Sequence, residues 1–254
     1  MPWNPEIYNE FKNIRYQPFF DLAENISSEG LKKAIDIGCG TGEQTYILSE
    51  KFKEAHFLGI DSSAEMLEKS FDFENERLSF KQKTIEELYD SNDKWDLIFS
   101  NAALQWSDDH EKLFPKLLSL LNNNGQFAVQ MPVQSENMLN QILFQLASEE
   151  PYKTQLNGWN RISPVLSLDQ YAKIMFDAGL KDLNIFMKVY PIIADNVEKL
   201  FQFISGSALI PYLEILDKDD HDKFISEYKK RIAEKFDKFP TIYAFKRMLL
   251  YGKK

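Results

Sequence analysis

The sequence predicts an α/β fold in which helices cover both faces of a mostly parallel sheet. From residue 33 onward, short apolar runs typical of buried strands alternate with segments of helical periodicity. A glycine-rich loop at residues 36–42 lies between the first expected strand and the first expected helix of that series. An acidic residue, Asp61, ends the second expected strand. This combination is typical of folds that bind a nucleotide-like ligand at the carboxyl ends of their strands.

Helical segments are expected before the first strand. Asn4 can cap a helix and Pro5 can occupy its first turn. Apolar residues then recur at helical spacing at Ile7, Tyr8, Phe11 and Ile14. Pro18 is expected to break or restart the helix, with a second apolar set at Phe19, Phe20, Leu22 and Ile26.

The strand–helix alternation follows. Strands are expected at residues 34–37, 56–60, 78–83, 95–99 and 126–131. Helices are expected near residues 42–52, after a capping-box pattern at Ser62 and Glu65, and near residues 109–121. The turn-rich residues 122–125 are expected to separate the last of these helices from the fifth strand.

The second half of the chain has longer helical stretches. We expect a helix at 136–150, a loop at 151–166, and a helix that Ser167 and Gln170 open and Gly179 ends. Strands at 183–190 and 241–251 flank a charged helical stretch at 195–238. We therefore predict one domain over residues 1–254, with a core and a helical lid over the carboxyl ends of the strands. The core comprises residues 31–133, 167–190 and 241–254, and the lid residues 1–27, 134–166 and 195–238.

Composition excludes several classes of partner. The formal net charge is −9 and the sequence pI is about 5.0, so a nucleic acid partner is not expected. Cys39 is the only cysteine, which fits a reducing compartment. The sequence shows neither a signal peptide nor an apolar run that could span a membrane, so we expect a cytoplasmic protein. His56, His110 and His221 lack ligand spacing, so no metal site is expected.

The glycine loop distinguishes between ligands. A dinucleotide fingerprint requires a third glycine at position 43, where this chain has Glu43. A carboxylate there would repel a pyrophosphate, whereas S-adenosylmethionine has no phosphate. The loop therefore favours S-adenosylmethionine, with a dinucleotide or a ligand-free glycine turn as the alternatives.

Longer segments carry a resemblance to a family. Residues 36–42 followed by Asp61, and residues 96–101, resemble the motifs of class I S-adenosylmethionine-dependent methyltransferases. Residues 3–5 with Tyr8 and Phe11, and residues 101–106, 128–132, 206–211 and 245–247, resemble a narrower group, the trans-aconitate methyltransferases. This resemblance implies a Rossmann-like, seven-stranded, mostly parallel sheet whose last strand is antiparallel.

The resemblance also implies a cofactor site. The glycines would pass under S-adenosylmethionine, Asp36 would lie near its amino end, and Asp61 would hold the ribose. Thr84 stands where the family often has an acidic residue for the adenine, so either its hydroxyl or the backbone of Ile85 would make that contact. The implied cofactor-binding residues are Asp36, Gly38, Cys39, Gly40, Gly42, Asp61, Ser62, Met66, Thr84, Ile85 and Asn101.

Methyl transfer to a carboxylate requires few catalytic groups at the acceptor site. A carboxylate is already ionised at pH 7, so methyl transfer to it requires no general base. The enzyme has to place the acceptor and exclude water. Gln105 and Trp106 are the candidates for positioning, and no residue is assigned as a catalytic base. The candidates for substrate binding are Tyr8, Arg15, Gln17, Trp106 and Arg247, the arginines because guanidinium pairs bidentately with carboxylate.

The sequence thus predicts an O-methyltransferase that forms a methyl ester on a small carboxylic acid, with trans-aconitate or a related polycarboxylate as the expected acceptor. Two alternatives remain open. One is a carboxyl methyltransferase of the malonyl-acyl-carrier-protein type, and the other is a non-catalytic S-adenosylmethionine-binding protein.

Overall fold

The computed structural model describes residues 12–89, 93–161 and 163–254, and the chain divides into two compact units. We call them the sheet unit and the helical unit. The sheet unit comprises Pro18–Pro132, Pro164–Lys188 and Arg247–Lys254, and the helical unit Met1–Gln17, Val133–Ser163 and Val189–Lys246. Residues 18–27, predicted as part of the lid, belong to the sheet unit, and residues 241–246, predicted as part of the core, belong to the helical unit. The placement of a lid over the strand ends stays a prediction.

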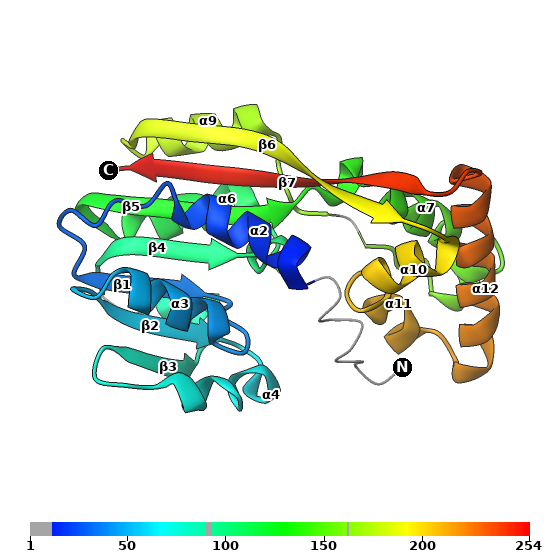
Figure 1. Cartoon of the computed structure of the whole chain (residues 1–254), viewed down its shortest axis with the longest axis horizontal. Helices are drawn as coiled ribbons and strands as arrows, with labels where there is room; N and C mark the ends of the chain where they lie inside the picture. The colour runs from blue at the N-terminus through cyan, green and yellow to red at the C-terminus, as the bar shows by residue number, and fades with distance from the viewer. Residues whose placement is uncertain (1–11, 90–92, 162) are drawn as a thin grey trace. The chain divides into compact units, whose positions relative to one another are not determined.

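Seven strands form one sheet in the order β3-β2-β1-β4-β5-β7-β6 (Figure 1). Their bounds are β1 Lys33–Ile37, β2 His56–Asp61, β3 Leu78–Gln82, β4 Trp95–Asn101, β5 Leu121–Pro132, β6 Lys181–Ala194 and β7 Thr241–Lys253. Strands β1 to β5 pair in parallel, and β7 runs antiparallel to β5. The predicted mostly parallel sheet with an antiparallel last strand is confirmed. The strand order reverses between β1 and β4, and folds of this kind bind ligands at that point.

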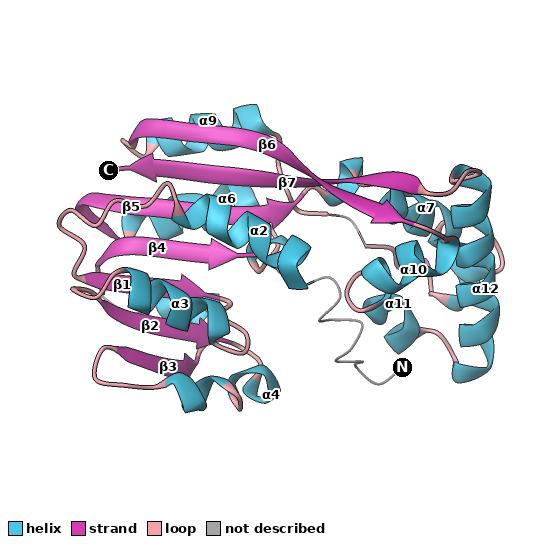
Figure 2. Ribbon diagram, in the orientation of Figure 1, coloured by secondary structure: helices cyan, strands magenta, loops and turns pink. Residues whose placement is uncertain are grey.

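Helices cover both faces of the sheet unit (Figure 2). On one face, Phe19 of α2 (Lys12–Ala23) and Leu48 of α3 (Glu43–Lys51) share an apolar cluster with Ala34, Leu97 and Ala128. On the other face lie α6 (His110–Ser119) and α9 (Leu168–Asp177). The ring of Phe114 packs there against that of Phe127, with centroids 5.6 Å apart. Neighbouring strand residues point to opposite faces, so both faces of β5 are buried.

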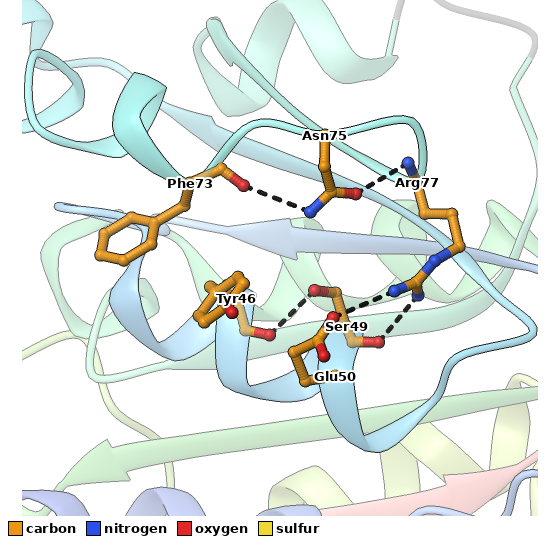
Figure 3. Close-up of polar contacts among 6 residues, drawn as sticks. All are labelled: Tyr46, Ser49, Glu50, Phe73, Asn75 and Arg77. Carbon is orange, nitrogen blue, oxygen red and sulfur yellow. Dashed lines mark hydrogen bonds and ion pairs between the residues drawn. The ribbon is translucent and has the colours of Figure 1, made fainter.

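Side-chain contacts tie α3 to the segment that leads into β3 (Figure 3). The Arg77 guanidinium donates to the carbonyl oxygen of Ser49 at 3.0 Å and forms an ion pair with Glu50 at 3.0 Å. The rings of Tyr46 and Phe73 stack with centroids 5.2 Å apart. These contacts hold α3 against the segment that precedes β3.

The helical unit has its own core. Its helices are α7 (Met138–Ala147), α8 (Tyr152–Gln155), α10 (Val197–Ser205), α11 (Ile210–Ile215) and α12 (Lys218–Lys235). Buried side chains such as Leu143, Phe201, Tyr212 and Phe224 fill the space between them. The hydroxyl of Tyr228 is also buried and donates to the carbonyl oxygen of Leu139 at 2.9 Å, which links α12 to α7. No helix in the described ranges is both long and apolar enough to cross a membrane.

Two predicted helix boundaries are wrong. Helix α2 continues through Pro18. Proline removes one helical hydrogen bond there, but Pro18 and Phe19 are buried, and burial of the helix outweighs that loss. Ser63, and not Ser62, caps α4 (Ala64–Leu67), because the Ser63 hydroxyl accepts from the backbone N–H of Met66 at 3.2 Å.

The predicted start of the fifth strand, at residue 126, is also wrong. Strand β5 begins at Leu121 and includes the asparagines that were expected to form a turn. The Asn124 N–H donates to the carbonyl oxygen of Lys254 at 2.9 Å, and the Lys254 N–H donates to that of Gly125 at 2.8 Å. Partners from the end of the chain therefore hold this stretch in the sheet. The expected loop at 151–166 contains α8, and β6 and β7 are longer than predicted.

The capping of α9 is confirmed. Ser167 and Gln170 form the predicted capping box, in which each side chain bonds the other's backbone N–H. Gly179 follows the helix with a φ of 84°, and its N–H donates to the carbonyl oxygen of Phe176. Both signals are local, so the sequence alone is enough to specify them.

Candidate functional site

A cavity of about 400 Å³ opens within the sheet unit, at the carboxyl ends of β1, β2 and β3 and beside the loop that follows β4. This is the place that the reversal of strand order predicts for a ligand. The residues that line it are Ile37, Gly38, Ile60, Asp61, Ser62, Lys83, Thr84, Ile85, Glu86, Ala103, Trp106 and Ser107. Six of the predicted site residues are among them: Gly38, Asp61, Ser62, Thr84, Ile85 and Trp106.

The glycine loop passes closely against its neighbours. Gly38 has a φ of 73°, and a Cβ there would lie 2.1 Å from the Cβ of Ala103. Gly42 caps α3 with a φ of 78°, and a Cβ there would lie 2.6 Å from the Cβ of Ser70. Both positions therefore require glycine, for conformation and for space. The loop is left with its backbone exposed toward the cavity at Gly38.

Replacing Gly38 by alanine is expected to lower the free energy of unfolding by about 2–4 kcal/mol, because a left-handed residue gains a Cβ and Ala103 has to move. Gly179→Ala is the matched control, since Gly179 has a φ of 84° but open space around the added atom. That variant should lose only about 1 kcal/mol. Urea unfolding measures both values. Equal losses would show that contact with Ala103 is not what requires glycine at position 38.

Asp61 organises the loop from the end of β2. One carboxylate oxygen accepts from the backbone N–H of Gly40 at 2.9 Å, and the other accepts from that of Ser63 at 2.9 Å. An ionised carboxylate has about four acceptor positions, so two remain available for hydroxyl groups of a ligand in the cavity. Asp61 thus fixes the glycine loop and presents acceptors to the cavity at the same time.

Asp36 is a buried carboxyl beneath the loop. Its exposed fraction is 3%, and the Thr45 hydroxyl donates to its Oδ2 atom at 2.6 Å. The Oδ1 atom is buried and accepts no hydrogen bond from the residues that the structure describes. Burial raises the pKa of Asp36 to about 7; the Thr45 bond opposes this rise and the charge of Asp61 adds to it. A cationic group bound nearby would favour the ionised form of Asp36.

The raised pKa predicts a pH-dependent effect of Asp36→Asn. The unfolded chain ionises Asp36 near its ordinary pKa of 3.8, but the folded protein retains the proton up to about pH 7. The stability that Asp36 contributes is therefore fully present below about pH 4 and is lost as pH rises from about 4 to about 7. Asparagine does not ionise, so the melting temperature of the variant relative to wild type should rise between about pH 4 and pH 7 and stay constant above that range. If the difference in melting temperature between Asp36→Asn and wild type does not change with pH, the raised pKa of Asp36 is contradicted.

Thr84 caps α5 (Ile85–Tyr89), a short helix that the sequence interpretation missed. The backbone N–H of Thr84 donates to the Glu87 carboxylate at 2.8 Å, and the Thr84 hydroxyl accepts from the Glu87 N–H at 3.2 Å. The Thr-x-x-Glu pattern was the signal that could have revealed this helix. The hydroxyl keeps one acceptor position for a ligand, while Lys83 and Glu86, also missed, add charges to the cavity lining.

A chain of amides leads away from the glycine loop. The Asn101 side chain donates to Gln44 in α3 at 2.8 Å and accepts from the Gln130 amide at 2.6 Å. Gln130 in turn accepts from the Arg247 guanidinium at 2.9 Å. Arg247 lies in β7 and is only 8% exposed. The chain therefore connects a buried cation with the first turn of the helix that follows the loop.

The remaining cofactor candidates lie around the loop. Met66 is 45% exposed, and its methyl carbon would lie 3.2 Å from a Cβ at Gly40. Cys39 is half-buried, and burial, with the charges of Asp36 and Asp61, raises the pKa of its thiol. This supports a packing role for Cys39 over a nucleophilic one.

The two positioning candidates share one short turn, η2 (Leu104–Trp106). Trp106 is 44% exposed and lines the cavity. Gln105 is 3% exposed, and its amide donates to the carbonyl oxygen of Ala102 at 2.7 Å. Gln105 thus holds the turn, and Trp106 faces the ligand space.

Two substrate candidates, Arg15 and Gln17, belong to the helical unit. Arg15 donates to the carbonyl oxygen of Phe203 at 2.9 Å, and Gln17 is exposed. Tyr8 lies outside the described residues. Their part in substrate binding stays a prediction. Among the described residues, no group of three or more His, Cys, Asp or Glu side chains is arranged to hold a metal ion.

Sequence comparison identifies relatives along almost the whole chain. Residues 28–179 match the family model described as a methyltransferase domain. A trans-aconitate 2-methyltransferase of Deinococcus radiodurans is 38% identical over 255 residues, which cover 98% of this chain and 97% of that protein. The enzyme of the same name from Escherichia coli O1:K1 is 28% identical, with 99% and 98% of the two chains covered.

Solved structures share the fold at lower identity. The YcgJ protein of Bacillus subtilis is 18% identical and has a TM-score of 0.62, with 94% of this chain and 98% of that chain covered. Phosphoethanolamine N-methyltransferase 2 of Haemonchus contortus, solved in complex with S-adenosyl-L-methionine, is 17% identical with a TM-score of 0.56. The match covers 94% of this chain and 52% of that one. At these identities the likeness shows the fold.

Proposed function

The chain belongs to the S-adenosylmethionine-dependent methyltransferases, and from this premise we propose that it methylates a carboxylate of trans-aconitate or a related polycarboxylate, forming a methyl ester. S-adenosylmethionine is the methyl donor, so neither a dinucleotide nor a ligand-free glycine turn explains the loop. The observation that carries the choice of acceptor is the near full-length similarity to trans-aconitate 2-methyltransferases. The buried Arg247 supports a negatively charged acceptor.

The cavity fits the cofactor in three respects. The Gly38 backbone forms part of its wall at a point where a Cβ would collide with Ala103. Asp61 offers two unused acceptor positions, which suit the two ribose hydroxyls. The buried Oδ1 atom of Asp36 suits a neighbouring ammonium group, whose charge would lower the raised pKa of Asp36. We assign the adenine to the side lined by Ser62, Thr84 and Ile85.

The residues of this chain contribute mainly by orienting the methyl donor and the acceptor. S-adenosylmethionine would supply a methyl group bound to a positively charged sulfur. An acceptor oxygen would attack the methyl carbon in line, and the sulfur would leave as the neutral thioether of S-adenosylhomocysteine. A carboxylate acceptor is ionised at pH 7 and needs no base. Trp106 covers one side of the cavity and excludes water there. Asp61 and the glycine loop hold the donor in place, so most of the rate acceleration comes from orientation.

We assign Arg247 to a remote carboxylate of the acceptor. A guanidinium has five N–H donors in a planar fork, one of which points to Gln130. Bidentate pairing with a carboxylate uses two of them. Negative charge on the attacking oxygen disappears during transfer, so a cation is more useful at a carboxylate that does not react. This requirement favours an acceptor with more than one carboxylate.

An acceptor panel tests the proposed function. Release of S-adenosylhomocysteine is measured with trans-aconitate, other di- and tricarboxylates, a monocarboxylate, an amine, a phenol and malonyl-acyl carrier protein. We expect turnover with the polycarboxylates. Turnover with the carrier protein alone would favour the malonyl-type alternative, and turnover with only the amine or phenol would refute ester formation. The cytoplasmic location and the lid stay predictions.

A further inference from the structure

The loop between β4 and α6, which carries Trp106, is bent at both ends in an unfavourable backbone conformation. Ala102 has a φ of 56° and Asp109 a φ of 53°, a left-handed region that residues with a Cβ rarely adopt. Ala103 and Trp106 lie between these bends and line the cavity. A loop with such ends keeps its shape only when other contacts hold it.

One buried contact to this loop comes from His110. The His110 ring is 1% exposed, and its Nε2 atom lies 2.9 Å from the carbonyl oxygen of Leu104, which is fully buried. A carbonyl oxygen only accepts, so Nε2 carries the hydrogen and donates it. In a neutral imidazole the Nδ1 atom is then an acceptor.

A tyrosine from another helix fixes that arrangement. The Tyr171 hydroxyl, fully buried in α9, donates to Nδ1 of His110 and accepts from the backbone N–H of Leu166 at 3.1 Å. The Leu166 N–H occupies the oxygen, so the hydroxyl hydrogen is directed to His110. Burial also lowers the pKa of His110 below its ordinary value, which favours the neutral ring.

We propose that His110 and Tyr171 are positioning residues, which hold the Leu104 carbonyl and thereby place Ala103 and Trp106 on the wall of the cofactor cavity. Neither is among the residues that line the cavity, so both act through the loop. This inference rests on the proposed cofactor site, but it does not depend on the identity of the acceptor.

Two variants of His110 separate positioning from packing. In His110→Gln the side-chain amide reaches the place of Nε2 and can still donate to Leu104. In His110→Asn the shorter amide reaches only the place of Nδ1, so the bond to Leu104 is lost. Calorimetry with S-adenosylhomocysteine should show an affinity near wild type for His110→Gln and a loss of about tenfold for His110→Asn, which corresponds to about 1.4 kcal/mol. Thermal unfolding records the stability of each variant.

Equal affinities of the two variants, whether both near wild type or both reduced, would overturn the proposal. If His110→Asn does not fold, Tyr171→Phe replaces it, because this variant keeps the ring and removes only the hydroxyl. It should bind about threefold or more weakly than wild type, since both His110 tautomers then become accessible, and wild-type affinity would overturn the proposal. Asp61→Ala is measured in parallel. If that variant binds normally, the cofactor site itself is misassigned, and the inference fails together with it.

Discussion

Replacing Asp61 by alanine is expected to weaken cofactor binding by about 100-fold or more, because the two charge-assisted hydrogen bonds that we assign to the ribose would be lost together. The same change also releases the backbone N–H groups of Gly40 and Ser63. The glycine loop then keeps only its backbone bonds to β2, in which the N–H groups of Gly38 and Cys39 donate to the carbonyl oxygen of Ile60. Calorimetry with S-adenosylmethionine and S-adenosylhomocysteine measures the loss.

Asp61→Asn is the matched control for this result. Its single amide oxygen can still accept a hydrogen bond, and its size is unchanged. The loss should therefore be intermediate, at about tenfold. An Asp61→Ala variant that folds and binds within about threefold of wild type would contradict the role of Asp61.

Replacing Arg247 by alanine is expected to raise the Michaelis constant for the acceptor by at least about 30-fold, since the loss of a buried charge partner costs about 2–5 kcal/mol. The affinity for S-adenosylhomocysteine should stay close to wild type. Steady-state kinetics with an accepted polycarboxylate gives the first quantity, and calorimetry gives the second. Arg247→Ala also removes the hydrogen bond that Gln130 accepts. The melting temperature of the variant shows whether this loss destabilises the fold.

Two further variants sharpen this test. Arg247→Lys keeps the charge but not the planar fork, so it should restore part of the lost affinity for the acceptor. Arg77→Ala removes an arginine whose guanidinium contacts Ser49 and Glu50 in α3 (Figure 3) and should leave the Michaelis constant unchanged. If Arg77→Ala and Arg247→Ala raised it alike, the clamp assignment would be wrong.

The sequence predicted those parts of the fold that depend on neighbouring residues. The strands are marked by apolar runs, and Ser167, Gln170 and Gly179 mark the ends of α9 by side-chain and backbone chemistry within one turn. The glycine loop and Asp61 are also local signals, because each lies directly at the end of its strand. The amino-acid sequence of one protein is enough to find such signals.

Other features depend on residues that are distant in sequence. The asparagines at the start of β5 read as a turn, and only their pairing with Lys254 places them in the sheet. Pro18 reads as a helix break until the buried surroundings of α2 are known. Thr84 is an intermediate case, since its capping pattern was present in the sequence but the helix it opens is too short to show a period.

The hydrogen bonds between side chains of the site could not be predicted from the sequence. Nothing in the sequence links Gln44, Asn101, Gln130 and Arg247, yet the fold joins them by hydrogen bonds in one chain. The same holds for His110 and Tyr171, which come from different helices. Such contacts follow from the sheet order and the helix packing, and no local pattern specifies them.

The most direct test of the proposed ester formation is mass spectrometry of the product formed from trans-aconitate and S-adenosylmethionine. We expect an acid that has gained the mass of one methylene group and that mild base hydrolyses back to trans-aconitate, because the product is a methyl ester. When Asp61→Ala replaces the wild-type protein at a cofactor concentration near the wild-type dissociation constant, the yield of this product should fall by about 50-fold or more, because the cofactor occupancy falls by that factor. A wild-type protein that binds the cofactor but leaves trans-aconitate and every related polycarboxylate unmethylated would contradict the proposed ester formation.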